Sequence, residues 1–172
     1  MPLPKTVLSK YKNDVFVETG TLNGEAVRLA LDCEFKAVHS IDIDKIRIET
    51  LRPAMRGAPV TLYAGSSADV LGTILKRING RITFWLDAHP PGNVLDLVNT
   101  PVAAELEAIR NYVHTLPTTM LPTVMLDDMR LFTVGAKEVI VETLKASWRG
   151  ELLYEDTNIA TNDIMVYKPV QS

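Results

Sequence analysis

Residues 15–24 read VFVETGTLNG and join a short apolar, β-branched run to a turn that contains two glycines. The run predicts a strand. The stretch that follows, residues 24–32, carries apolar residues at three- and four-residue intervals, which predicts a helix with one buried face. A strand that passes through a glycine turn into a helix is the unit of a doubly wound α/β sheet, and such a sheet opens its ligand crevice at this turn.

Similar runs recur at regular intervals along the chain. Four apolar runs begin at residues 15, 37, 60 and 82, so their starts are 22, 23 and 22 residues apart. This spacing leaves room for a strand, a turn, a helix of about ten residues and a return loop. The stretches 44–51 and 67–78 repeat the helical spacing of apolar residues. The first half of the chain is therefore predicted to be a series of βα units.

The second half extends this sheet and ends differently. Thr100 and Pro101 are predicted to open a helix, residues 123–128 to form a fifth strand, and residues 134–147 to form another helix. The last two apolar runs, 151–156 and 163–168, leave no room for a helix between them, so we expect an antiparallel hairpin at one edge. The predicted fold is an α/β, doubly wound, three-layer αβα sandwich whose seven-stranded sheet is parallel except for one strand.

The composition predicts one domain over residues 1–172. With 47% hydrophobic residues, a chain of this length can bury roughly 70% of its extended surface. The single Cys33 excludes an intramolecular disulfide and a cysteine zinc cluster. Because no secretory signal, bilayer-spanning run or C-terminal anchor is recognisable, a cytoplasmic location is expected. The net charge of −3, without basic runs, argues against nucleic-acid and membrane partners and favours small ones.

The glycine turn is the first candidate binding site. Glu18, Gly20 and Gly24 form the pattern E-x-G-x-x-x-G. Gly20 would let the backbone approach a ligand without a Cβ in the way, and Gly24 would permit a tight entry into the helix. A dinucleotide-binding turn would instead have a glycine where Glu18 stands. An ordinary turn that needs two glycines explains the same residues.

Two further strand ends carry polar residues that suit a nucleoside. Asp42 is expected at the end of the second strand, where a carboxylate can accept hydrogen bonds from both hydroxyls of a ribose. Asp44 is instead predicted to cap the following helix. Ser66 and Ser67 follow the third strand; their hydroxyls could bond to a base, or Ser67 could cap the next helix.

An acidic cluster is predicted at the same edge of the sheet. Asp87 and His89 follow the fourth strand two residues apart, so their side chains lie on the same side. Asp127 and Asp128 follow the neighbouring fifth strand. Three carboxylates that converge in a cleft repel one another unless a cation or a proton offsets them, which favours Mg²⁺. The alternative is a set of polar strand-end residues that cap helices and bind water.

Together these motifs resemble the class I S-adenosylmethionine-dependent methyltransferases, and the resemblance covers residues 12–169. It implies a Rossmann-like methyltransferase fold and S-adenosylmethionine (SAM) as the cofactor. The charge of Glu18 would attract the ammonium and sulfonium groups of SAM. The residues that the resemblance assigns to the cofactor are Glu18, Thr19, Gly20, Thr21, Gly24, Asp42, Ser66 and Ser67.

The acidic residues extend the resemblance to metal-dependent enzymes. An Asp after strand four and an Asp pair after strand five resemble the metal triad of the macrocin and mycinamicin type of sugar O-methyltransferase. The resemblance implies that Asp87, Asp127 and Asp128 hold Mg²⁺, which would orient an acceptor hydroxyl and lower its pKa. His89 would be the general base beside Asp87. The chain lacks the N-terminal extension and lid helices of those enzymes, so their substrate specificity does not carry over.

The loop 90–99 has the length and Pro/Gly content of an active-site lid. Its four apolar residues could instead form an oligomer contact, for example in a homodimer: Val94, Leu95, Leu97 and Val98. Arg130 follows the acidic pair and could neutralise it, contact an anionic acceptor or form a structural salt bridge.

Three functional hypotheses follow. The first is metal-assisted methyl transfer from SAM to the hydroxyl of a small-molecule acceptor such as a sugar or natural product. The second is an NAD-dependent oxidoreductase, against which Glu18 and the terminal hairpin count. The third is a non-enzymatic module that keeps the fold and binds a partner through the apolar loop.

Overall fold

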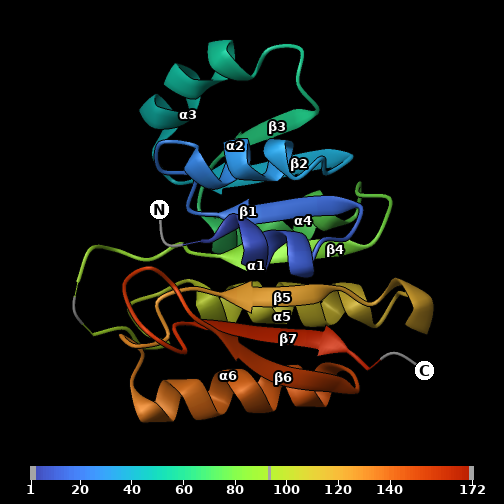
Figure 1. The fold of residues 1–172 in the computed structure, drawn as a ribbon, viewed down its shortest axis with the longest axis vertical. Coiled ribbons are helices and arrows are strands. Elements are labelled where there is room, and N and C mark those ends of the chain that lie inside the picture. The colour runs from blue at the N-terminus through green and yellow to red at the C-terminus, as the bar shows by residue number, and fades with distance from the viewer. Residues whose placement is uncertain (1–2, 93, 171–172) are drawn as a thin grey trace.

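The computed structural model describes residues 3–92 and 94–170, which form a seven-stranded sheet between two layers of helices (Figure 1). The strands are β1 (Val15–Thr19), β2 (Ala37–Asp42), β3 (Val60–Ala64), β4 (Ile82–Leu86), β5 (Thr123–Leu126), β6 (Gly150–Glu155) and β7 (Ile164–Pro169). Their order across the sheet is β3-β2-β1-β4-β5-β7-β6. Only β7 runs antiparallel to its neighbours, so the predicted sheet and its terminal hairpin are confirmed.

The helices divide between the two faces of the sheet. One layer contains α1 (Lys5–Lys10), α2 (Glu25–Asp32) and α3 (Lys45–Leu51), which the short 3₁₀ turn Arg52–Met55 extends. The other layer contains α4 (Ser67–Leu75), α5 (Val102–Val113) and α6 (Val134–Ser147). A second 3₁₀ turn, Thr118–Met120, precedes β5. In Figure 1, α1 and α2 lie in front of the sheet, while α4 and α5 lie behind it. The three-layer prediction is therefore confirmed.

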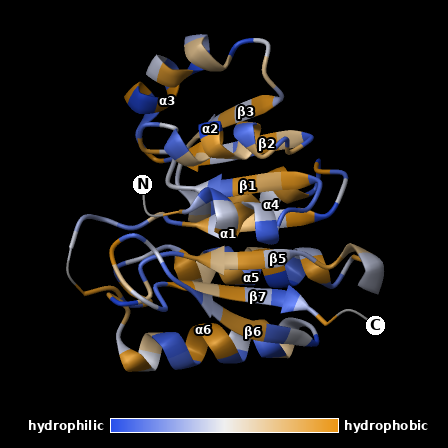
Figure 2. Cartoon of the chain, in the orientation of Figure 1, coloured by the Kyte–Doolittle hydropathy of each residue, from blue (hydrophilic) through white to orange (hydrophobic). Residues whose placement is uncertain are grey.

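The central strands explain why the sheet is covered on both sides. Every residue of β1, β4 and β5 is buried, whereas the edge strands β3 and β6 contain exposed residues. Successive side chains of β1 alternate between the layers, because Phe16 packs with α1 and α2 while Val17 packs with α4 and α5. Figure 2 shows the resulting hydrophobic colouring of the central strands. Continuous apolar runs of this kind are typical of parallel strands buried on both faces.

The ends of several elements place polar residues as the sequence predicts. Gly24 precedes α2 with a φ of 72°, a left-handed conformation that favours glycine. Asp44 caps α3, since its Oδ1 accepts hydrogen bonds from the backbone N–H groups of Ile46 (2.9 Å) and Arg47 (3.1 Å). The strand β5 ends at Leu126, so the two aspartates that follow it lie beyond the edge of the sheet.

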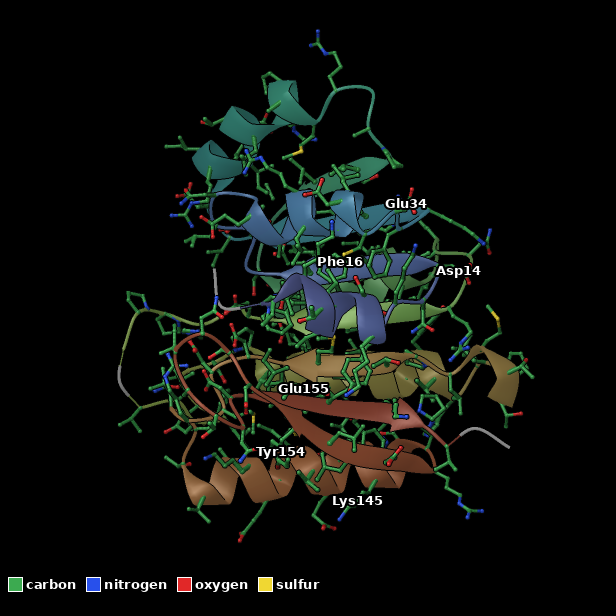
Figure 3. The ribbon with its side chains drawn as sticks, viewed as in Figure 1. Asp14, Phe16, Glu34, Lys145, Tyr154 and Glu155 are labelled. Atoms are coloured by element: carbon green, nitrogen blue, oxygen red, sulfur yellow. The ribbon has the colours of Figure 1, made fainter. Side chains whose placement is uncertain are left out.

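The helix α1 is an element that the sequence motifs do not predict. It is only six residues long, so its apolar residues show little periodicity, and it has no side-chain cap that would mark its start. Leu8 on this helix is fully buried, and Lys10 contacts Glu155 at the end of β6 (2.5 Å). The hydroxyl of Tyr11 donates to the same carboxylate, which Figure 3 labels. These contacts attach the N-terminal segment to the terminal hairpin.

Two of the four apolar residues in the loop 90–99 pack inward, so the four are not all available for an oligomer contact, while the lid and the homodimer stay predictions. Residue 93 lies outside the described part of the chain. Leu95 is 1% exposed and forms an isolated β-bridge with Phe132, and Leu97 packs against the core. Only Val94 and Val98 of the four apolar residues are exposed, because the backbone bridge turns the others inward. None of the helices in the described ranges is long and apolar enough to cross a bilayer.

Candidate active site

The carboxyl ends of β1, β2, β4 and β5 meet at one edge of the sheet and bring the predicted residues together. Thr19 pairs with Ile41 on one side and with Leu86 on the other, and Leu86 pairs with Leu126. The residues that follow these positions therefore lie side by side. They include the glycine turn, the end of β2 and both segments that carry the acidic cluster.

Glu18 lies almost fully buried at the end of β1. Its Oε2 accepts a hydrogen bond from the hydroxyl of Ser40 at 2.5 Å, and that hydroxyl lies 2.6 Å from the hydroxyl of Thr21. Burial raises the pKa of Glu18 to about 8, and the nearby carboxylates of Asp87 and Asp42 add to the rise. At neutral pH this carboxyl is mostly protonated, and a cation placed beside it would favour the ionised form.

Gly20 is required by the contact between two strand ends. Its φ is 88°, and a Cβ at this position would lie 2.5 Å from the backbone oxygen of Asp87. Its N–H donates to the backbone oxygen of Ile41 at 2.8 Å. The glycine therefore allows the turn after β1 to pack directly on the segment after β4. This close approach is to the chain's own backbone, whereas the sequence-based argument placed a ligand there.

The carboxylate of Asp42 joins β2 to the glycine turn. Its Oδ2 accepts a hydrogen bond from the N–H of Leu22 at 2.9 Å and lies 3.5 Å from Nη1 of Arg47, while its Oδ1 accepts from the N–H of Asp44 at 2.8 Å. Each carboxylate oxygen has two lone pairs, so Oδ1 retains capacity for another donor. Asp42 is therefore oriented by the backbone around it.

Asp42 is itself buried (6% exposed), but three aliphatic residues that bond to it or follow it closely in the chain are exposed, and sequence reasoning missed them. Leu22 is 54% exposed, and Ile43 and Ile46 are 79% and 80% exposed. Leu22 bonds to Asp42 through its backbone, and Ile43 is the next residue along the chain. The sequence feature that could have indicated this surface is Ile43, an apolar residue directly after Asp42 at the end of β2. Apolar side chains beside an oriented carboxylate form a surface that suits a ring with a polar sugar attached.

The remaining predicted cofactor residues are hydroxyl side chains near the ends of β1 and β3. Thr19, Thr21 and Ser67 are buried, and Ser66 is partly buried. The hydroxyl of Thr19 has no hydrogen-bond partner among the described residues. Ser67 is the first residue of α4 and does not cap it; Ser66 holds the capping position, without a side-chain bond. Direct contact with a ligand would therefore fall to the exposed turn rather than to these three buried hydroxyls.

His89 forms the centre of the acidic cluster. Its Nε2 lies 2.9 Å from Oδ2 of Asp128 and 3.4 Å from Oδ1 of Asp87, and its Nδ1 lies 3.0 Å from the backbone oxygen of Pro90. A carbonyl oxygen only accepts, so Nδ1 carries a proton, and Nε2 donates to the carboxylates. The contacts with Asp128 and Asp87 raise the pKa of His89 to about 10. In this arrangement the ring is an imidazolium, which cannot act as a general base.

Arg130 supplies a second positive charge to the cluster. Its Nη1 lies 2.6 Å from Oδ1 of Asp128 and also contacts the carboxylate of Asp163. Asp163 is fully buried and accepts further hydrogen bonds from the N–H of Arg130 (3.1 Å) and from the hydroxyl of Thr157 (3.0 Å). The chain's own cations therefore offset the repulsion for which the sequence suggested a metal. Asp163 was not predicted, since it precedes β7 and lies far from the other acids in the sequence.

The described residues do not form the predicted metal trio as an open site. The two groups of three that could meet around an ion are Asp87, His89 and Asp128, and Asp127, Asp128 and Asp163. Both oxygens of Asp128 already contact His89 and Arg130. Of the three predicted metal ligands, only Asp127 retains a buried oxygen, Oδ2, with no partner in the described structure. Burial raises the pKa of Asp127 to about 8, so it is mostly protonated at neutral pH. The residues as arranged do not fit a preformed Mg²⁺ site.

Glu105 is a further acidic residue that sequence reasoning missed as a site. It lies on α5, is 1% exposed, and its Oε1 has no hydrogen-bond partner in the described structure. Burial raises the pKa of Glu105 to about 7. It lines a water-sized cavity of about 10 Å³ together with Asp87, His89 and Asp127. The available signal was a glutamate within an apolar stripe, three residues after Val102.

Comparison with known proteins identifies the class of fold. No protein-family model matches the sequence, and no curated protein is significantly similar to it. Human methyltransferase-like protein 13, solved with S-adenosylhomocysteine (SAH), is 12% identical, with a TM-score of 0.62 over 98% of this chain and 77% of that chain. The SAH-bound methyltransferase PaMTH1 of Podospora anserina is 13% identical, with a TM-score of 0.63 over 97% and 76% of the chains.

An rRNA methylase from Streptococcus thermophilus is 15% identical, with a TM-score of 0.58 over 97% of this chain and 94% of that chain. All three similarities extend over nearly the whole of this chain, including the terminal hairpin. The chain therefore has the Rossmann-like fold of the class I methyltransferases.

Proposed function

We propose that this chain transfers a methyl group from SAM to a hydroxyl of a small-molecule acceptor. The observation that carries the proposal is the surface at the ends of β1 and β2. There the oriented, buried carboxylate of Asp42 accepts from the backbone of the exposed Leu22 in the turn that follows Glu18, and the exposed Ile43 and Ile46 follow Asp42 in the chain. A nucleoside needs both features, because its ribose is polar and its base is a flat ring.

The two positively charged groups of the cofactor match the carboxyl group of Glu18 at the end of β1. SAM supplies a methyl group already activated on a sulfonium, so the protein's main task is to hold donor and acceptor in line. Oδ1 of Asp42 has a lone pair free for a ribose hydroxyl. Burial raises the pKa of Glu18, and the ammonium and sulfonium groups placed beside it would favour its ionised form.

Asp87 is the proposed proton acceptor for the hydroxyl. Its side chain is 25% exposed, and burial raises its pKa, so it is a stronger base than an exposed aspartate. His89 lies between Asp87 and Asp128 and would orient both carboxylates as an imidazolium. Removal of the acceptor proton by a positioned base contributes about 10²–10⁴-fold to the rate.

Assistance by Mg²⁺ is not part of this proposal, because the residues as arranged do not fit a preformed Mg²⁺ site. It would require Asp128 to release His89 or Arg130, since both oxygens of Asp128 are occupied. Methyl transfer that continues unchanged in EDTA would contradict metal assistance and leave the cofactor proposal intact.

Isothermal titration with SAM and SAH tests the cofactor proposal. We expect micromolar binding by the wild-type protein and at least tenfold weaker binding by D42A and D42N. The matched control is D32A, because Asp32 is an exposed aspartate at the far end of α2 from the glycine turn. Thermal unfolding of each variant shows whether the fold is retained. A wild-type protein that binds neither compound would contradict the proposal, and a nicotinamide titration would then test the NAD alternative.

A further inference from the structure

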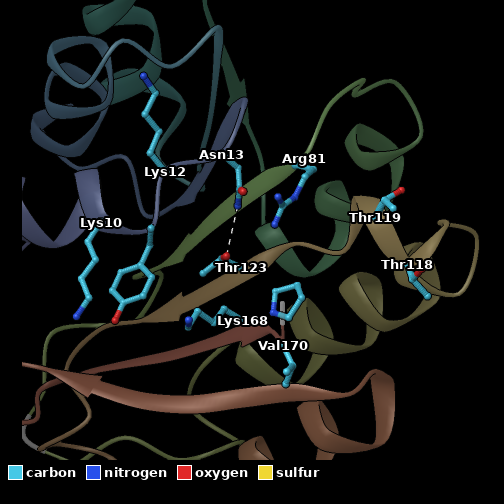
Figure 4. A pocket seen from close by; sticks show the side chains of 11 residues that line it. Lys10, Lys12, Asn13, Arg81, Thr118, Thr119, Thr123, Lys168 and Val170 are labelled. Carbon is cyan, nitrogen blue, oxygen red and sulfur yellow. Dashed lines mark hydrogen bonds between the residues drawn. The ribbon is translucent and has the colours of Figure 1, made fainter. Parts of the chain in front are cut away.

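A second cavity lies at the opposite edge of the sheet from the candidate active site. It has a volume of about 550 Å³ and forms where β1, β4 and β5 begin and β7 ends (Figure 4). Parallel strands of about five residues separate the two edges by roughly 15 Å. The volume lies within the range of about 300–1,000 Å³ that small-molecule sites occupy. Nothing in the proposed methyl transfer uses this cavity.

The lining of this cavity is basic, although the whole chain carries a net charge of −3. Four cationic residues line it, no acidic residue does, and several threonine hydroxyls complete the wall. The cationic residues are Lys10, Lys12, Arg81 and Lys168. Positive charge is thus concentrated at one edge of the sheet, and the acidic residues of the candidate active site at the other.

Arg81 is the cation of this cavity whose side chain has no hydrogen bond or ion pair among the described residues, although its charge also acts on the nearby carboxylate of Asp14, which accepts from the N–H of Arg81 (3.1 Å). Its Nε is buried and has no hydrogen-bond partner among the described residues. Lys10 is paired with Glu155, Lys168 lies 3.1 Å from Glu151, and the amine of Lys12 lies over the ring of Phe35. Figure 4 shows the side chain of Arg81 reaching from the start of β4 toward Thr123 and Lys168, while the amines of Lys10 and Lys12 point away from it.

The hydrogen-bond donors of this cavity indicate which kind of ligand it would bind. A buried N–H of a guanidinium that lacks an acceptor costs free energy, and an oxyanion placed there would remove this cost. A planar guanidinium matches the oxygens of a phosphate, and the exposed hydroxyls of Thr118 and Thr119 lie at the same cavity to donate further bonds. A carboxylate could also bind there, but two cations, Arg81 and Lys168, favour a ligand with more than one negative charge.

We propose that this cavity binds a small phosphorylated anion, held by the guanidinium of Arg81 with Lys168 and the threonine hydroxyls. The site is independent of the methyl-transfer proposal, because no residue is shared between the two edges. A small ligand is favoured over a nucleic-acid chain, since two cations, not an extended basic surface, face the cavity.

Calorimetric titration with inorganic tripolyphosphate at low salt tests the proposal. We expect binding by the wild-type protein and at least tenfold weaker binding by R81Q. The matched control is R77Q, because Arg77 is exposed in the same α4–β4 connection but does not line the cavity. R77Q should bind as the wild type does. K168Q should weaken binding by a smaller factor, because Lys168 shares its charge with Glu151.

Thermal unfolding distinguishes a ligand role for Arg81 from a structural one. R81Q without ligand should unfold at the same or a higher temperature than the wild type, because it loses an unpartnered buried donor. Tripolyphosphate should raise the unfolding temperature of the wild type and not that of R81Q. The proposal is overturned if the wild type does not bind tripolyphosphate, if R81Q binds it equally well, or if a twelve-nucleotide RNA binds while tripolyphosphate does not.

Discussion

At the scale of single residues, burial controls the charge of the candidate active site. Glu18 and Glu105 are both almost completely buried, and in each case burial is the largest cause of a raised pKa. His89 shifts in the direction that keeps it charged, because two carboxylates contact it. The site at neutral pH therefore contains protonated acids and a protonated histidine, which is the reverse of what the residue types suggest.

Glu18 makes cofactor binding dependent on pH. Without a cation its pKa is about 8, so binding of a positively charged cofactor must release a proton from it below that pH. Affinity for SAM should therefore rise between pH 6.0 and 7.5, by up to about tenfold per pH unit. E18Q should bind more weakly with a flatter pH profile. Titration in two buffers of different ionisation enthalpy measures the released proton, and an equal pH slope in E18Q would contradict this role.

Glu105 lowers stability when it is ionised. Its pKa rises from 4.5 to about 7, so the folded state disfavours the charge. The stabilisation that E105Q gives to the folded state should therefore be larger at pH 8.5 than at pH 5.5, by about 2 kcal/mol in the free energy of unfolding. Urea unfolding at the two pH values measures this.

The control for Glu105 lies on the same helix. Glu107 is two residues further along, 57% exposed, and only weakly paired with Arg110. E107Q should change the free energy of unfolding by less than about 0.5 kcal/mol at either pH. A stabilisation of E105Q that is equal at both pH values would show that shape, not charge, is the cause.

At the scale of elements, the contact between the ends of β1 and β4 holds the site in register. A Cβ on Gly20 would lie 2.5 Å from the backbone oxygen of Asp87, and the φ of 88° is already unfavourable for alanine. G20A should therefore reduce the free energy of unfolding by about 2–4 kcal/mol. It should also displace the segment that carries Asp87 and His89.

A second glycine separates the cost of the backbone conformation from the cost of the contact with Asp87. Gly57 has a similar φ of 85°, and a Cβ there would have no atom within 4 Å. G57A should cost only about 1 kcal/mol, from the backbone conformation alone. Chemical unfolding of both variants measures the difference, and equal losses would show that the contact with Asp87 is unimportant.

The terminal hairpin also determines the site, although it contributes no predicted ligand. The fully buried carboxylate of Asp163, just before β7, accepts from the backbone and the side chain of Arg130. Met129 donates its N–H to the backbone oxygen of Asp163 at 2.9 Å. These bonds fix the segment after β5, and with it Asp127 and Asp128. A hairpin that completes the sheet thus orients the acidic cluster.

At the scale of the whole molecule, the raised pKa values predict how stability changes with pH. A carboxyl whose pKa is higher in the folded than in the unfolded state stabilises the fold fully below its unfolded pKa, and this stabilisation is lost as pH rises through the folded pKa. Glu18 loses it between about 4.5 and about 8, and Glu105 between about 4.5 and about 7. His39 opposes them, since burial lowers its pKa.

The free energy of unfolding should therefore fall from pH 5.5 to pH 8.5. Three buried carboxyls, those of Glu18, Glu105 and Asp127, and the imidazolium of His89 lose stabilisation over this range, against the opposite effect of His39, so the net loss is at least about 2 kcal/mol. Urea unfolding across this range measures the change. Combining E18Q with E105Q should reduce the slope without removing it, and a wild-type stability that rises with pH would contradict the prediction.

The local chemistry of the chain was enough to predict most of the fold. The 22- or 23-residue spacing of apolar runs required helices between parallel strands, and the short gap before the last run required a hairpin. Asp42, Asp87, Asp127 and Asp128 could be placed at one edge because parallel strands end together. The helix α1 escaped prediction, since six residues show little periodicity.

The layers, the strand directions and the acids that share an edge could be predicted from the sequence, because they follow from local periodicity and chain direction. The charge of each acid could not, because its burial and its partners come from distant segments of the folded chain. Arg130, held by Asp163 from the segment before β7, pairs with Asp128, and α5 places Glu105 beside the ends of β1 and β4. Leu95 is held by its bridge to Phe132. Protonation depends on such contacts, and they cannot be predicted from the spacing of residues along the chain.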